Sequence, residues 1–158
     1  MKSKRAAAVL GSVAIGISTV AWGSPSAVAD LGAPEFTLKA VTIAEHYEDV
    51  GRKGESIGDT LVFSEKLFHA GDRVGRAAVT CSVIGVGKSA FRLLCSATLT
   101  LRGHGDLNVH GKVVFREGSS RLPVLAVTGG TGDYTGATGT MTLRESNRAS
   151  RYDIALTG

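Results

Sequence analysis

AAVTCSVI (77–84) and LLCSATL (93–99), two short stretches near the middle of the chain, decide the fold. In both, apolar side chains alternate with small polar ones, which is the period-two pattern of a β-strand with one buried face. The glycines between them, Gly85 and Gly87, favour a tight turn. The two stretches therefore predict an antiparallel hairpin centred on Lys88.

The first 29 residues have the three parts of an export signal. A basic start at residues 2–5 is followed by an uncharged, mostly apolar run at 6–22, and Ala27-Val28-Ala29 supplies small residues before Asp30. The alternative, a membrane anchor, is disfavoured by the glycines and the proline in this region. We expect residues 1–29 to be a cleaved signal peptide and residues 30–158 to be one secreted domain, with no stable membrane insertion after cleavage.

The predicted hairpin sets the chain's only two cysteines opposite each other. Counted outward from Lys88, Cys81 and Cys95 stand at the same distance (88 − 81 = 95 − 88 = 7). A non-hydrogen-bonded pair of this kind has Cα atoms about 4.5 Å apart, which is within disulfide reach. Because an exported chain meets oxidising conditions, we expect a Cys81–Cys95 disulfide. The alternative, a catalytic thiol, needs a histidine brought to it from elsewhere in the chain.

Composition and charge narrow the class of protein. The 158 residues are 43% apolar and 20% charged, with 21 glycines and no sustained helical period, which argues against disorder and against a helix bundle. Without the three basic residues of the leader, 15 basic residues face 14 acidic ones, a net charge of 15 − 14 = +1. No block of Lys and Arg remains, so we exclude a nucleic-acid partner.

Alternating segments separated by turn-forming residues predict the architecture. Eight strands with mostly short connections favour an all-β fold, an eight-stranded antiparallel up-and-down β-barrel with room inside for one small ligand; a β-sandwich is the alternative. The predicted strands cover residues 36–47, 60–68, 75–84, 91–101, 106–115, 122–128, 137–143 and 151–156.

The most distinctive local stretch is VTGGTGDYTGATG (127–139). A phosphate-binding loop would need a Lys-Ser/Thr pair, or a helix with an acidic residue beyond it, and neither follows. Threonines and alternation continue to Leu143, so we interpret the glycines as turn residues between two strands.

This region resembles a known family. LAVTGGTGDY (125–134) is similar to a motif shared by the allene oxide cyclase and dirigent families, and GDTLVFSEKLF (58–68), RVG (73–75) and VHG (109–111) follow the cyclase family's order. The resemblance covers residues 36–157. It implies an eight-stranded barrel, frequently a trimer, with an apolar cavity and no cofactor. We therefore expect a homotrimer and a small apolar molecule as partner.

The resemblance also implies where the pocket lies. In the cyclase pattern, a Phe and a polar amide two residues later line the pocket on the second strand; here the matching residues are Phe63 and Glu65. A carboxylate thus replaces a neutral amide, so the amide's role does not carry over, but a buried carboxyl with a raised pKa can act as an acid or a base. A pocket cysteine of the plant cyclases matches Cys81, and a pocket tyrosine falls near Val113.

Strand parity supports the same placement independently. Phe63 and Glu65 share one face of their strand, so an outward Lys66 turns both toward the interior. The same parity places Leu99 and Val113 on the cavity wall. The alternative is a fully packed barrel in which Glu65 only forms a buried hydrogen bond, or a register slip that turns it outward.

We therefore predict Glu65 as the catalytic residue, with Phe63, Leu99 and Val113 as substrate-binding residues. His104 and His110 are too isolated to specify a metal site, so none is predicted. Two functions remain open: a cofactor-free cyclase or isomerase that folds a reactive apolar substrate into shape, or a non-catalytic binder, either a dirigent-like guide or a carrier.

Overall fold

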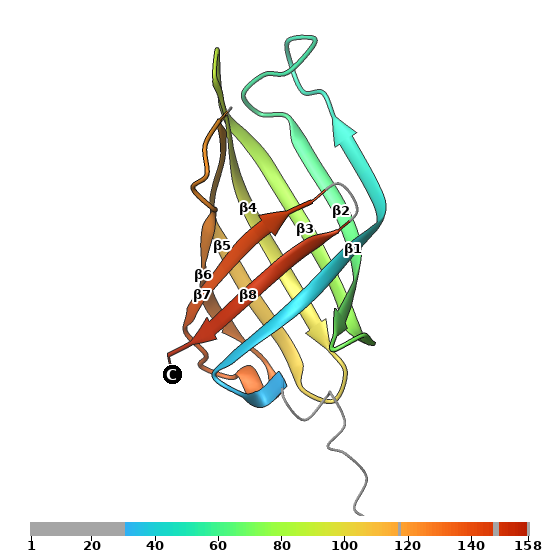
Figure 1. The fold of residues 1–158 in the computed structure, drawn as a ribbon. Coiled ribbons are helices and arrows are strands. Elements are labelled where there is room, and N and C mark those ends of the chain that lie inside the picture. The colour runs from blue at the N-terminus through green and yellow to red at the C-terminus, as the bar shows by residue number, and fades with distance from the viewer. Residues whose placement is uncertain (1–30, 117, 147–148, 158) are drawn as a thin grey trace, which may run out of the picture.

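Eight antiparallel strands pair in chain order, and the last returns to the first to close a barrel (Figure 1). The computed structural model describes residues 31–116, 118–146 and 149–157, so the predicted export signal at 1–29 lies outside the described residues. No helix in the described part of the chain is long and apolar enough to cross a membrane. The strands are β1 (Glu35–Glu48), β2 (Thr60–His69), β3 (Asp72–Gly87), β4 (Ala90–Leu101), β5 (Gly105–Arg116), β6 (Val124–Gly130), β7 (Gly139–Glu145) and β8 (Ser150–Leu156).

The predicted barrel and hairpin are confirmed. Along β3, Ala77, Val79 and Cys81 are buried, while Ala78 and Thr80 between them are exposed. The hairpin register sets Cys81 opposite Cys95. The two strands run on to Gly87 and Ala90, because a bulge between Val83 and Gly85 shifts the register by one residue before the turn.

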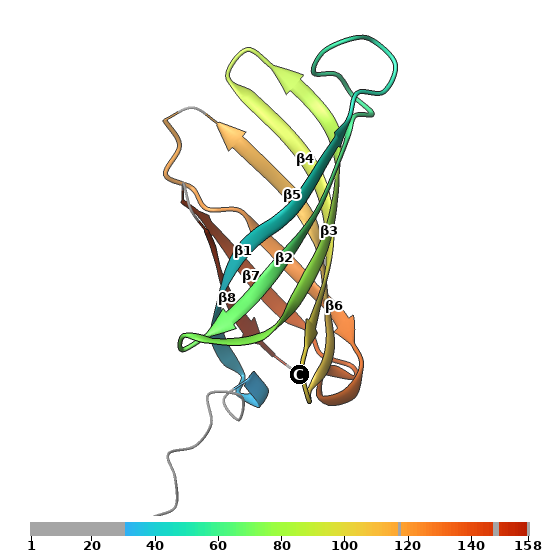
Figure 2. The same ribbon diagram turned by 90° about the vertical axis from the view of Figure 1, so that its right-hand side faces the viewer.

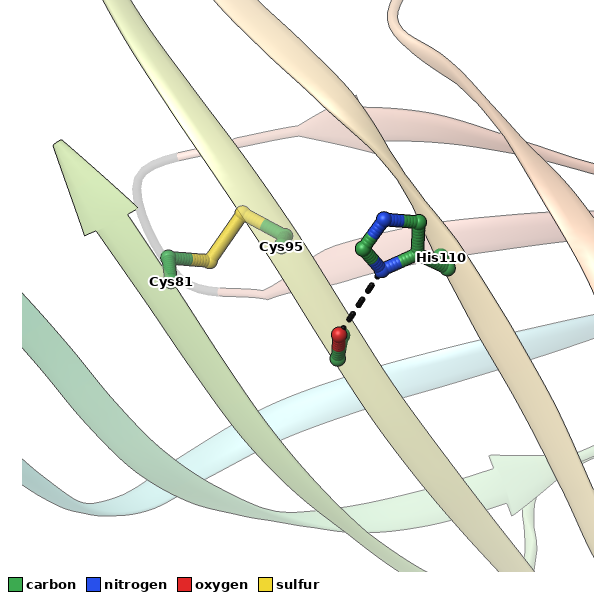
Figure 3. The surroundings of a disulfide bond; sticks show 4 residues. Cys81, Cys95 and His110 are labelled. Carbon is green, nitrogen blue, oxygen red and sulfur yellow. Dashed lines mark hydrogen bonds between the residues drawn. A yellow bond between two sulfur atoms is a disulfide. The ribbon is translucent and has the colours of Figure 1, made fainter. Parts of the chain in front are cut away.

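The Cys81–Cys95 disulfide is also confirmed. It joins neighbouring strands β3 and β4 with a Cα–Cα distance of 4.1 Å (Figure 3). On the outer face of the sheet, the hydroxyl of Ser96 lies 2.8 Å from Nδ1 of His110. The alternation of the strand therefore separates the inward disulfide from this outward polar pair.

The glycine-rich stretch closes one end of the barrel. It forms the end of β6 and a short 3₁₀ turn, η2 (Gly132–Tyr134), where the sequence indicated only a turn. Tyr134 is 1% exposed, and its hydroxyl donates to the Leu31 carbonyl at 2.9 Å. A Cβ atom at Gly130 would lie 2.1 Å from the Asp106 carbonyl oxygen, so only glycine allows this close approach.

The opposite end of the barrel has a wall of unequal height. β1 pairs with β8 only through residues 35–40, and β5 pairs with β6 only from Leu107 to His110. Within the described residues, the upper parts of β1 to β5 therefore rise without β6, β7 and β8 beside them (Figure 2). This leaves the interior open at the end that carries the β1–β2 loop.

We expect the disulfide to contribute strongly to stability. Replacing both cysteines, Cys81→Ala with Cys95→Ala, should lower the free energy of unfolding by about 3 kcal/mol, because the bridge closes a loop with a sequence separation of 14. Urea unfolding followed by far-UV circular dichroism measures the change. Ser82→Ala, one residue along β3, is the control and should stay within about 0.5 kcal/mol of the natural protein. A double variant as stable as the control would contradict this role.

Candidate functional site

A cavity of ≈ 240 Å³ occupies the half of the barrel nearer the β1–β2 loop. All eight strands contribute to its lining, which is mostly apolar. The closed end below it is filled by the packed core, which includes Leu99, Leu107 and Tyr134. The barrel is therefore a one-ended cup rather than a fully packed cylinder.

Glu65 lies in this cavity and is 1% exposed. The hydroxyl of Tyr152, on β8, donates to Glu65 Oε2 at 2.5 Å across the interior. Burial raises the pKa of the Glu65 carboxyl; hydrogen bonds from Tyr152 and Thr42 lower it, and the charge of Glu145 raises it further. The pKa of Tyr152 is also raised, first by burial and then by Glu65. The pair places a carboxyl group that binds its proton more tightly than usual beside an apolar space.

Strands β2 to β5 supply much of the apolar cavity wall. Phe63 and Val113, both predicted from the sequence, line the cavity together with the disulfide. Leu99 does not: it is fully buried in the core below the cavity, although it shares the inward face of β4 with Ala97. The alternation along β4 predicts that Leu99 points inward, but not how far along the barrel axis it lies. At its level the interior is filled by packed core side chains.

Four polar residues of the cavity were missed by sequence reasoning: Thr42, Glu145, Ser150 and Tyr152. The sequence indicates which residues of β8 point inward, because Tyr152 and Ile154 are two residues apart. Nothing in the sequence, however, places these residues opposite Glu65.

A register shift at the bulge in β1 brings a further acid to the cavity. The shift falls between Thr42 and Ala44, after which Glu45 stands opposite Phe63 and lines the cavity with it. Without the extra residue the alternation would have turned Ala44 inward instead. The sequence carried no signal for this bulge.

One rim of the cup is organised by Asp59, which is fully shielded from solvent by its own loop. Its carboxylate accepts hydrogen bonds from the Tyr47 hydroxyl, from Ser56 N at 2.7 Å and from Val50 N at 3.0 Å. These bonds, the Tyr47 hydroxyl first, lower the pKa of Asp59 to about 2, and the same contact raises the pKa of Tyr47 to about 12. The loop between β1 and β2 is thereby tied to the end of the barrel.

Solved structures with the same architecture include a pyocyanin demethylase, which is 25% identical over 78% of this chain and 99% of that one, with a TM-score of 0.68. The Diels Alderase AbmU from Streptomyces koyangensis is 16% identical over 83% of this chain and 70% of that one, with a TM-score of 0.62. A pterocarpan synthase dirigent protein is also 16% identical, over 77% of this chain and 86% of that one, with a TM-score of 0.59. At 16% identity, the last two similarities concern the fold.

The sequence itself carries the signature of one family. No curated protein matches it significantly. The profile described as the allene oxide cyclase barrel like domain matches residues 39–156, which span β1 to β8. The chain therefore belongs to the allene oxide cyclase barrel-like family.

Proposed function

We propose that this barrel binds a small, largely apolar molecule in its cavity and promotes a cyclisation or isomerisation without a cofactor. The observation that carries the proposal is the buried carboxyl group of Glu65, which faces an otherwise mostly apolar cavity and is held by Tyr152. A carboxyl group with a raised pKa keeps its proton to a higher pH than an exposed one, and in a water-poor space it is suited to proton transfer.

The cavity wall supplies orientation and Glu65 supplies the proton transfer. An enclosure of ≈ 240 Å³ restricts a flexible substrate to few shapes, which lowers the entropic part of the barrier to ring closure. The Tyr152 hydroxyl fixes Oε2, which orients the carboxyl group toward the substrate. Below its raised pKa, Glu65 donates a proton; above it, the carboxylate accepts one.

A second function, non-catalytic binding as a dirigent-like guide or a carrier, is favoured by one observation. The cavity's cysteines are bonded to each other, so they offer no thiol nucleophile. In this reading the barrel only holds a reactive molecule made elsewhere, and Glu65 contributes a hydrogen bond.

We further propose that the protein acts outside the cell as the mature domain 30–158 and that it self-associates as a trimer. Export is supported by the leader pattern of residues 1–29 and by the disulfide, which persists in oxidising surroundings. Association is supported by large apolar side chains on the outside of the barrel, such as Val62, Ile84 and Leu94, which are 40–44% exposed.

Replacing Glu65 tests the proton-transfer role. Native mass spectrometry of the protein purified from culture supernatant identifies the retained small molecule, which then serves as substrate. Glu65→Gln should keep the fold and lower kcat at saturating substrate by about 10²- to 10⁴-fold, because the amide cannot transfer the proton. Glu35→Gln, at the closed end of β1, is the matched control. An unchanged kcat would show that Glu65 takes no part in the reaction. If neither the natural protein nor Glu65→Gln turns the molecule over and both bind it equally well, the protein is a non-catalytic binder.

Intact-mass analysis tests export. Under non-reducing conditions the secreted protein should begin at or near Asp30 and weigh two hydrogens less than its reduced form, because Cys81 and Cys95 are joined. A secreted chain that keeps residues 1–29 would refute the cleavage.

Light scattering tests association. The mature domain should give the mass of a trimer over a wide concentration range, because burial of outward apolar side chains stabilises the assembly. A monomer mass throughout would contradict the proposal.

A further inference from the structure

The charges around the cavity all have one sign. Glu45, Glu65 and Glu145 line it, and no Lys, Arg or His does so among the residues that the structure describes. None of the three carboxylates forms an ion pair with a described residue. Only Glu65 is buried, whereas Glu45 and Glu145 are exposed to solvent at the open end. The one charged group inside the cavity is therefore an acid that no basic side chain of the lining balances.

The three acids gather on one side of the cavity. Glu45 comes from β1, Glu65 from β2 and Glu145 from the end of β7. Glu45 stands nearer the β1–β2 loop than Glu65, since it pairs with Phe63 while Glu65 pairs with Thr42. A molecule entering at the open end thus passes Glu45 before it reaches Glu65.

Aromatic rings share the lining with these acids. Phe63, Phe115 and Tyr152 all line the cavity. The rest of the wall from β3 to β5 is apolar without rings, and includes Val79, Leu93 and the disulfide. The faces of aromatic rings attract cations, most strongly where water is excluded. Rings and carboxylates together form the combination that recognises an organic cation, whereas an aliphatic wall alone would favour a neutral hydrocarbon.

Basic side chains are present at this end of the barrel, but outside the cavity. Lys88, Arg116 and Arg121 line a separate groove between the β3–β4 turn and the β5–β6 connection, which shares Phe115, Leu143 and Glu145 with the cavity rim. These cations are therefore not placed to neutralise Glu65, which faces Tyr152 and Thr42 inside the cup.

We propose that the cavity takes a compact aromatic ligand that carries a positive charge on nitrogen, such as an N-alkylated heteroaromatic ring, with the charge turned toward Glu65. The inference rests on the proposed function, since it names the class of ligand that the same cavity binds. A cation supplies the counter-charge that the buried acid lacks, so binding removes a cost that the empty cavity carries. With such a ligand bound, Glu65 is a carboxylate and acts as a base.

Binding of a cation should also depend on pH. Burial raises the pKa of Glu65, and partial desolvation raises that of Glu145, although Glu145 stays open to solvent and weighs less. The other groups around Glu65 are the hydroxyls of Tyr152 and Thr42. Because a cation prefers the deprotonated cavity, its affinity rises as pH rises through the raised pKa of Glu65 and then levels off.

Three probes of nearly equal size separate charge from shape. 1-Methylquinolinium is a permanent cation, 1-methylnaphthalene is its neutral isostere, and 1-naphthoate is an anion on the same bicycle. Equilibrium dialysis of the natural protein should show the cation bound at least about tenfold more tightly than the isostere, and the anion most weakly. The affinity for the cation should rise as the pH is raised above 4.5, the ordinary pKa of a glutamate carboxyl group, and then level off, while that for the isostere stays constant.

Two variants locate the effect. Glu65→Gln should reduce the preference for the cation over the isostere by at least about fivefold and flatten its pH dependence, because it removes the buried charge. Glu35→Gln removes the same charge from the closed end of β1 and should leave both unchanged. If circular dichroism shows that Glu65→Gln does not fold, the natural protein provides the test. Its affinity for the cation should then rise with pH while its affinity for the isostere does not, and equal pH dependence of the two would overturn the inference.

The possible failures are distinct. Equal binding of cation and isostere, or tightest binding of the anion, overturns the charge inference and leaves small-molecule binding in place. Binding of none of the three contradicts the proposed function itself, since a cavity of this size and lining should take at least one of them. A preference for the cation that falls equally with Glu65→Gln and with Glu35→Gln places the effect in the overall charge of the protein and overturns the inference. A preference that is unchanged by Glu65→Gln also overturns it, because the charge of Glu65 then plays no part.

Discussion

The pairing of β1 with β8 is the contact on which the rest of the structure depends. It joins the two ends of an eight-stranded sheet and so creates an inside that water reaches from one end only. The pairing involves just the first part of β1, from Glu35 to Ala40. Because closure is confined to the lower barrel, the core is packed there and a cavity remains above it. Both the stability and the proposed activity of the molecule follow from where this closure stops.

The architecture was predictable from the sequence because its signals are local. Alternation within each strand, glycines at the turns and the equal spacing of Cys81 and Cys95 about Lys88 are each contained in a short window. The pairing of Cys81 with Cys95 in the hairpin of β3 and β4 was therefore predicted correctly, and so was the disulfide. The bulges at Thr42 and Val83 were not predicted, because an extra residue in one strand is fixed by the neighbouring strand rather than by its own composition.

In the candidate site too, features set within one strand were predictable and contacts between distant strands were not. The inward direction of Phe63 and Glu65 follows from alternation within β2, so the sequence was enough to bring both to the cavity. The partner of Glu65 was not predictable, since Tyr152 is 87 residues away and meets it only across the closed barrel. For Leu99 the local alternation predicts that the side chain points inward. Whether it lines the cavity or lies in the packed core depends on the side chains of the opposite strands, which the sequence of β4 does not reveal.

The loop tied down by Asp59 gives the entrance of the cup a different response to acid from that of its interior. A carboxylate whose pKa falls from its ordinary 3.8 to about 2 stabilises the folded loop at every pH above the ordinary value, and this contribution is lost only as the pH falls toward 2. Glu65 behaves in the opposite sense, because burial makes it take up its proton at a higher pH than usual. As the pH falls, the interior of the cavity therefore loses its charge before the rim loses the hydrogen bonds to Asp59, so the loop at the entrance keeps its shape over a pH range in which Glu65 is already protonated.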